Sequence, residues 1–139
     1  MRERILLDTG PLVSFIDRRE STHPWVRETF ASVRVPFLTC EPVLTEACFL
    51  LQRMSGAIRQ IREWLENGFI RVPFQLQDES RRVFALMEKY RALPMSLADA
   101  SLVAMIESGL GDRVFTLDKH FRVYRHSGRR VVPVLMPEG

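Results

Sequence analysis

The sequence contains little cysteine and lysine and has no long hydrophobic run. Of its 139 residues two are cysteines, and only two of its 20 basic residues are lysines. Cys40 and Cys48 lie eight positions apart without a CxxC motif, so they make no disulfide framework, and we expect reduced thiols in a cytoplasmic protein. No apolar stretch approaches the roughly 20 residues of a membrane span. The apolar run behind the basic start, residues 5–7, is too short for a signal peptide.

Positive charge is concentrated in the last fifth of the chain. Residues 1–112 carry 14 basic and 15 acidic side chains, whereas residues 113–139 carry six basic and two acidic ones. Eighteen of the 20 basic residues are arginine, whose planar guanidinium binds phosphate oxygens two at a time. The distribution therefore favours contact with nucleic acid. The alternative is an ordinary solvated surface, on which arginine is more frequent than lysine only because of the base composition of the genome.

Hydrophobic periodicity predicts short strands that alternate with helices. With 46% hydrophobic and 27% charged residues, the composition is that of a folded globular protein, and residues 1–139 are expected to form one domain. We predict strands over residues 4–8, 35–39, 69–74, 114–117 and 131–134. We predict helices over residues 12–17, 22–33, 42–54, 57–66, 78–91 and 96–108, and one helical turn over residues 119–124. This alternation indicates an α/β fold with a mainly parallel sheet of about five strands, covered by helices on both faces.

Two aspartates directly follow predicted strands. Asp8 ends the strand that contains residues 5–7, and Asp118 ends the strand over residues 114–117. Either residue could simply cap the helix or turn that follows. If the sheet is parallel, however, both carboxylates lie at the same edge, where ligand sites of open α/β sheets form.

Two further acids occupy predicted helices. Asp99 lies three residues after Ser96, which is the spacing of a helix-capping box, so a structural role is a strong alternative. Glu46 is in the middle of a helix, on or beside its apolar stripe, where a cap cannot explain it. Its structural alternative is a buried ion pair with Arg53. An unpaired buried carboxylate is costly, so Glu46 needs either a partner or a function.

Four ionised carboxylates at one edge of a sheet would repel one another. Two unit charges about 4 Å apart interact with about 4 kcal/mol at an effective dielectric constant near 20. Such a cluster requires a cation or partial protonation, and an all-oxygen ligand set suits Mg²⁺ or Mn²⁺ better than zinc. These ions activate water for displacement at phosphorus. An acidic metal site beside a basic surface is the combination that a nuclease requires.

Four short motifs together resemble the PIN-domain family. They occur in the same order and spacing as in the family and extend over essentially the whole chain, most like its small VapC-type toxins. The motifs are Ile5-Leu6-Leu7-Asp8-Thr9-Gly10-Pro11-Leu12, Leu44-Thr45-Glu46-Ala47, Leu97-Ala98-Asp99-Ala100 and Val114-Phe115-Thr116-Leu117-Asp118-Lys119-His120-Phe121.

The resemblance implies a single-domain, three-layer α/β/α PIN-like fold and a metal-dependent endoribonuclease. The family's catalytic acidic quartet corresponds to Asp8, Glu46, Asp99 and Asp118. The first, third and fourth of these acids would ligate Mg²⁺ or Mn²⁺, and Glu46 would orient or deprotonate water or hold a second ion. Thr9 and Thr116 match supporting hydroxyl positions.

The resemblance also implies partners. VapC-type proteins usually pair with a small antitoxin protein and often form homodimers, and their substrate is RNA. The basic C-terminal segment suggests RNA-binding residues, namely Arg122, Arg125, Arg129 and Arg130.

Three alternatives differ from a toxin. A PIN-domain RNase of RNA processing would have no antitoxin, and a short upstream reading frame for an antitoxin would distinguish the two. A catalytically silent module would only bind RNA or protein, and its RNA handling would survive carboxylate-to-amide substitutions. A phosphatase on a similar sheet is disfavoured because the sequence has no glycine-rich phosphate loop and no Asp-x-Asp motif after the first strand.

Overall fold

A five-stranded parallel sheet forms the centre of the protein. The computed structural model describes residues 2–34 and 36–138. The strands follow one another across the sheet as β3 (Ile70–Arg71), β2 (Phe37–Leu38), β1 (Ile5–Leu7), β4 (Arg113–Phe115) and β7 (Val134–Leu135), and all neighbouring pairs are parallel. The predicted α/β class and the five-stranded parallel sheet are confirmed.

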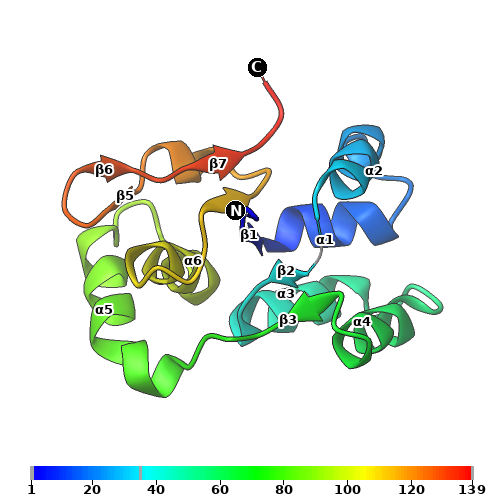
Figure 1. Cartoon of the computed structure of the whole chain (residues 1–139), viewed down its shortest axis with the longest axis horizontal. Helices are drawn as coiled ribbons and strands as arrows, with labels where there is room; N and C mark the ends of the chain where they lie inside the picture. The colour runs from blue at the N-terminus through cyan, green and yellow to red at the C-terminus, as the bar shows by residue number, and fades with distance from the viewer. Residues whose placement is uncertain (1, 35, 139) are drawn as a thin grey trace.

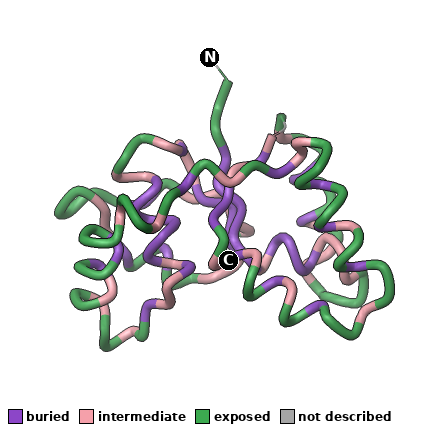
Figure 2. The backbone as a smooth tube through the Cα atoms, turned by 90° about the horizontal axis from the view of Figure 1, so that it is seen from below, coloured by how far each residue is buried: buried purple, intermediate pink, exposed green. Residues whose placement is uncertain are grey.

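Helices cover both faces of this sheet, which makes three layers (Figure 1). On one side lie α5 (Leu76–Lys89) and α6 (Leu97–Glu107), and on the other lie α1 (Thr9–Ile16), α2 (His23–Ser32) and α4 (Ala57–Glu66), with α3 (Glu41–Leu51) contacting both groups. The side chains of β1 alternate accordingly. Leu6 packs with α5 and α6, whereas Ile5 and Leu7 pack with α1, α2 and α4. Figure 2 shows the buried strands running between the two helical layers.

The first helix begins earlier than its sequence suggests. We predicted a turn at Gly10-Pro11 and a helix from Leu12, but α1 starts at Thr9, immediately after Asp8. Pro11 lies in the first turn, where a backbone N–H has no partner within the helix and its loss costs little. Asp8 is thereby the N-cap residue of α1 and stands between a strand and a helix.

The prediction of one strand over residues 131–134 was wrong. The segment belongs to two elements, β6 (Arg130–Val131) and β7, and β6 pairs antiparallel with β5 (Arg125–His126) in a separate hairpin. Ser127 and Gly128 both have positive φ angles, which a tight hairpin turn requires. Pro133 separates β6 from β7 because it cannot donate a ladder hydrogen bond. The predicted strand over residues 35–39 is β2, although residue 35 lies outside the described part of the chain.

The order of the strands defines where a site can form. From β1 the chain adds β2 and β3 on one side, and it then returns to add β4 and β7 on the other. The order in which the chain adds strands therefore reverses between β1 and β4, and the carboxyl ends of these two parallel strands flank a position where α/β folds typically form ligand sites. None of the helices in the described ranges has the length and apolar character needed to cross a membrane.

Candidate active site

Asp8 lies at the carboxyl end of β1 and is buried, with 5% of its surface exposed. Its backbone N–H donates to the carbonyl oxygen of Phe115 on β4 (3.0 Å), which ties it to the neighbouring strand. Its Oδ1 accepts from the backbone N–H of Thr9 (2.8 Å), and its Oδ2 accepts from the hydroxyl of Thr116 (2.7 Å). Asp8 is thus a cap residue and also a carboxylate held in a fixed orientation by two donors.

Glu46 reaches the same place from α3. The hydroxyl of Thr9 donates to Oε1 of Glu46 at 2.8 Å, which links α3 to the start of α1. We expected Glu46 to lie on or beside the apolar stripe of its helix and therefore to be buried. This expectation was wrong, because Glu46 is exposed. The alternative of an ion pair with Arg53 does not occur among the described side chains, and the second carboxylate oxygen accepts no hydrogen bond there.

Asp99 occupies the first turn of α6 and is half-buried. As the spacing predicts, Ser96 caps the helix, because its hydroxyl oxygen accepts from the backbone N–H of Asp99 (3.0 Å). The carboxylate itself turns to another element, since its Oδ2 accepts from the hydroxyl of Tyr124 (2.8 Å). Tyr124 is completely buried and was missed in the sequence, where nothing in its spacing separates it from an ordinary core tyrosine.

Asp118 follows β4 by three residues and caps the short 3₁₀ helix η1 (Lys119–Arg122). Its backbone N–H donates to the hydroxyl oxygen of Thr116 (2.9 Å), so Thr116 contacts both Asp8 and Asp118. Its Oδ1 accepts from the backbone N–H of His120 (2.9 Å), and the ring Nδ1 of His120 lies 3.1 Å away. The two expected supporting residues, Thr9 and Thr116, therefore both bridge acids.

Electrostatic coupling shows that the four acids share one region. Burial, with smaller contributions from the charges of Asp99 and Asp118, raises the pKa of Asp8 to about 7 against the hydrogen bonds from Thr116 and Thr9, which lower it. Burial also raises the pKa of Asp99, with added contributions from Asp118 and Glu46. The pKa of Tyr124 is raised by burial and by Asp99, so its hydroxyl remains a hydrogen-bond donor. The raised pKa values of Asp8 and Asp99 thus show that no nearby positive charge balances these carboxylates.

The donor set fits a hard divalent cation. Among residues 2–34 and 36–138, no three carboxylate, imidazole or thiol side chains converge closely enough to form a ready-made metal site. The acids nevertheless offer only oxygen ligands, and a bound cation would stabilise the ionised forms of Asp8 and Asp99, whose pKa values are raised by burial and by mutual repulsion. The residues present therefore match Mg²⁺ or Mn²⁺ in chemistry and charge.

The nearest thiol does not offer an alternative chemistry. Cys40 is completely buried, and burial raises its pKa to about 12, so it stays a neutral thiol at physiological pH. Neither cysteine forms a disulfide. Cys40 therefore does not supply a thiolate nucleophile to the site.

The four candidate RNA-binding arginines lie on η1 and the β5–β6 hairpin, near the upper left of Figure 1. Arg122, Arg129 and Arg130 are exposed. Arg125 is half-buried, and its Nη1 donates to the carbonyl oxygens of residues 122, 123 and 124 at 2.8 to 3.0 Å. One end of its guanidinium thus supports the turn before β5.

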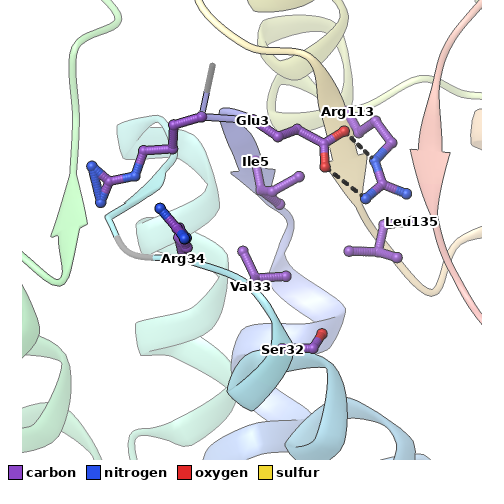
Figure 3. A pocket seen from close by; sticks show the side chains of 8 residues that line it. Glu3, Ile5, Ser32, Val33, Arg34, Arg113 and Leu135 are labelled. Carbon is purple, nitrogen blue, oxygen red and sulfur yellow. Dashed lines mark hydrogen bonds and ion pairs between the residues drawn. The ribbon is translucent and has the colours of Figure 1, made fainter.

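A hollow of about 670 Å³ lies away from the acids, beside the amino ends of β1 and β4 (Figure 3). Arg113 donates there from Nε and Nη2 to the two carboxylate oxygens of Glu3, at 2.7 and 2.8 Å. Val33, Ile5 and Leu135 form its apolar wall. The hollow holds no carboxylate cluster, so the four acids mark the better candidate for chemistry.

Comparisons with known proteins agree with this geometry. No curated protein matches the sequence significantly. Among solved structures, a crystal structure of Mycobacterium tuberculosis VapC20, described as a sarcin-ricin loop cleaving toxin, is similar with a TM-score of 0.73. The similarity covers 82% of this chain and 89% of the other at 19% sequence identity, which establishes a common fold. The family model for the PIN domain matches residues 5–126, and the protein therefore belongs to the PIN domain family.

Proposed function

We propose that this protein is a metal-dependent endoribonuclease and the toxin of a type II toxin–antitoxin pair. The observation that carries the proposal is the acidic cluster at the carboxyl ends of β1 and β4, where three hydroxyl groups orient three of the four carboxylates. Membership of the PIN domain family and the fold similarity to a toxin described as cleaving the sarcin-ricin loop support the same activity.

In this proposal Asp8, Asp99 and Asp118 hold Mg²⁺ or Mn²⁺. When bound, the ion would supply a Lewis acid that activates water and stabilises negative charge at phosphorus. Thr116 orients Asp8 and positions the backbone of Asp118, and Tyr124 holds one oxygen of Asp99. These donors fix the carboxylates before the substrate binds, as groups that hydrogen-bond to metal ligands commonly do in metal sites.

Glu46 is the proposed general base. Thr9 donates to its Oε1, and its Oε2 remains available to accept a proton from the attacking water. The water oxygen would attack phosphorus as this proton leaves, the phosphodiester bond to the leaving oxygen would break, and the leaving oxygen would take a proton from solvent water. Arg122, Arg129 and Arg130 would hold the RNA backbone, together with the remaining donors of Arg125.

The proposal includes one nuclease domain over residues 1–139 and two protein partners, a small antitoxin and a second copy of this chain in a homodimer. Phe49 and Leu50 on α3 support a protein contact, because these two large apolar side chains are 69% and 62% exposed. A cytoplasmic location belongs to the same proposal because the substrate is RNA.

Cleavage of a mixed pool of structured RNAs by the purified protein tests the activity. We expect cutting with Mg²⁺ or Mn²⁺ and none in EDTA. Asp8→Asn and Asp99→Asn should each abolish cutting while circular dichroism shows the native fold. Asp78→Asn, which removes an exposed carboxylate from the first turn of α5, is the matched control and should cut normally.

Two results would contradict the proposal. Cutting that persists in EDTA would remove the role of the metal. Equal activity of Asp8→Asn and the wild type would show that Asp8 only caps α1 and takes no part in catalysis. An antitoxin would be identified by coexpression with the adjacent upstream reading frame, whose product should bind the protein and suppress cutting.

A further inference from the structure

A groove of about 350 Å³ lies directly beside the acidic cluster. It opens between α3, the first turn of α6 and the segment that leads from β3 into α5. Its walls include the apolar side chains of Pro42, Phe74, Leu76 and Leu97. Glu46, the proposed general base, also lines it, so whatever occupies this α3–α6 groove lies next to the bond that the proposed reaction breaks.

The charges around the groove exclude a phosphate as its occupant. Its polar lining includes Glu41 and Glu46, and none of the described residues that line it is basic. Glu41 is exposed, and its carboxylate has no hydrogen-bond or ion-pair partner within the described part of the chain. The groove therefore suits a neutral, flat apolar group that carries N–H donors at its edge, because an ionised carboxylate only accepts hydrogen bonds.

We propose that the α3–α6 groove is a subsite for one unpaired nucleobase beside the scissile phosphate, with guanine preferred. The inference rests on the proposed ribonuclease function and adds a specificity to it. A hollow of this size, at the lower end of ligand pockets, accommodates a single planar base. RNA recognition commonly uses unstacked bases that lie on apolar or aromatic side chains and hydrogen-bond along their Watson–Crick edges.

Glu41 would select the base. The Watson–Crick edge of guanine presents two adjacent donors, N1–H and N2–H, to the two oxygens of one carboxylate. Adenine and cytosine present one amino donor beside a ring acceptor, and uracil presents one donor between two carbonyl oxygens that repel a carboxylate. Inosine keeps N1–H and lacks the amino group, so it isolates the second hydrogen bond.

The test is equilibrium binding of labelled heptauridylates that carry one central guanosine, inosine or abasic residue. Fluorescence anisotropy is measured in EDTA, so that the result does not depend on cleavage. We expect the guanosine oligonucleotide to bind about tenfold more tightly than the inosine one, and the abasic one to bind most weakly.

Two substitutions and a control locate the effect. Glu41→Gln keeps the size of the side chain but places an amide N–H where the second acceptor was, so the guanosine-to-inosine ratio should fall towards one. Leu76→Ala should weaken guanosine and inosine binding together because it removes part of the apolar wall. Glu66→Gln is the matched control, since Glu66 is an exposed acid at the end of α4, where the chain leads to the amino end of β3, and it should change neither value.

Equal affinities for guanosine, inosine and abasic oligonucleotides would overturn the subsite and would leave the groove for a protein segment. A preference that Glu41→Gln does not alter would overturn the role of Glu41. The same oligonucleotides are incubated in parallel with Mg²⁺ and Mn²⁺. Base-selective binding without cleavage would support the subsite and contradict the proposed nuclease activity. Cleavage without base selectivity would support the nuclease activity and contradict the subsite.

Discussion

At the scale of single residues, three hydroxyl groups decide how the acidic cluster is arranged. Thr9 holds Glu46, Thr116 holds Asp8, and Tyr124 holds Asp99. Each hydroxyl donates to one carboxylate oxygen, and for the two acids whose pKa burial raises, Asp8 and Asp99, this hydrogen bond favours the ionised form. The cluster is therefore partly compensated by hydrogen bonds, and the rest of the compensation is left to protons or to a cation.

Asp8→Asn should stabilise the metal-free protein at neutral and alkaline pH. The pKa of Asp8 is about 7 in the folded state against 3.8 as its ordinary value, so between these pH values the folded state binds the extra proton. The stability of the metal-free wild type therefore falls as the pH rises from about 4 to about 7, by an amount on the order of a few kcal/mol. Asparagine removes this dependence, and its amide can still donate to the hydroxyl oxygen of Thr116.

Urea unfolding in EDTA at pH 4.5 and pH 8 measures this effect. The midpoint of the variant should exceed that of the wild type at pH 8 and lie close to it at pH 4.5, and Mg²⁺ should raise the midpoint of the wild type alone. A variant that is less stable than the wild type at both pH values would show that the cap and its hydrogen bonds outweigh the repulsion.

Tyr124→Phe should weaken the proposed metal site and leave the fold intact. Without the hydroxyl, Asp99 loses the donor that fixes its Oδ2, and the loss of such a supporting group typically costs about 10- to 100-fold in metal affinity or activity. The expected result is a higher Mg²⁺ concentration for half-maximal cleavage. Activity at saturating Mg²⁺ should recover in large part.

Tyr90→Phe is the matched control for this experiment. The hydroxyl of Tyr90 accepts from the backbone N–H of Arg125 (2.9 Å), and its ring packs against that of Tyr124 at 5.2 Å between centroids. The substitution removes the hydroxyl of the half-buried partner in the same aromatic pair, and this hydroxyl does not contact an acid. Equal Mg²⁺ requirements in the two variants would assign Tyr124 a packing role only.

The four acids could be found in the sequence, but their supporting tyrosine could not. Asp8 and Asp118 directly follow buried strands, and the parallel sheet brings such positions to one edge by necessity. Glu46 and Asp99 were placed there through the family resemblance. Tyr124 lies 25 positions after Asp99, and their contact depends on how η1 packs against α6, which no local pattern encodes.

At the scale of elements, the sequence predicted types better than boundaries. The helix over residues 57–66 agrees at both ends with α4, because Gly56 and Asn67-Gly68 mark its limits. The segment over residues 131–134 contains only apolar residues, which favours one strand. The preceding turn and Pro133 divide it between two sheets instead, since pairing partners far along the chain decide which edge each half joins.

Gly111→Ala should destabilise the contact between β1 and the start of β4. A Cβ atom at position 111 would overlap Cδ2 and Cγ of Leu6, a completely buried side chain. One of the two must move within a packed core, which costs about 1–3 kcal/mol. The free energy of unfolding in urea measures this loss.

The double variant Leu6→Ala/Gly111→Ala separates the clash from any effect on the backbone. Leu6→Ala alone should be destabilising by about 2–5 kcal/mol because it leaves a cavity. If the clash is the cause, Gly111→Ala should add little or nothing once Leu6 is truncated. Additive losses would instead point to the conformation of the glycine.

At the scale of the whole molecule, the two charged features occupy different parts of one fold. The acids lie at the end of β1, on α3, on α6 and after β4. These elements surround the position between β1 and β4 where the strand order reverses. The excess of positive charge follows β4 in the chain and lies on η1 and the β5–β6 hairpin, which packs against α6. An RNA bound along the hairpin would thus lie next to α6, the helix that carries Asp99.

The charge reversal Arg129→Glu/Arg130→Glu should weaken RNA binding without altering the cleavage chemistry. Both side chains are exposed on the hairpin, and no ion pair holds either of them within the described structure. Each phosphate contact that is lost lowers the slope of log affinity against log salt concentration by nearly one unit, so the slope should flatten by about one to two units. Arg59→Glu/Arg62→Glu changes the net charge equally on α4 and should leave the slope unchanged. If both double variants flatten the slope equally, RNA responds to the net charge of the protein, and the hairpin is not its track.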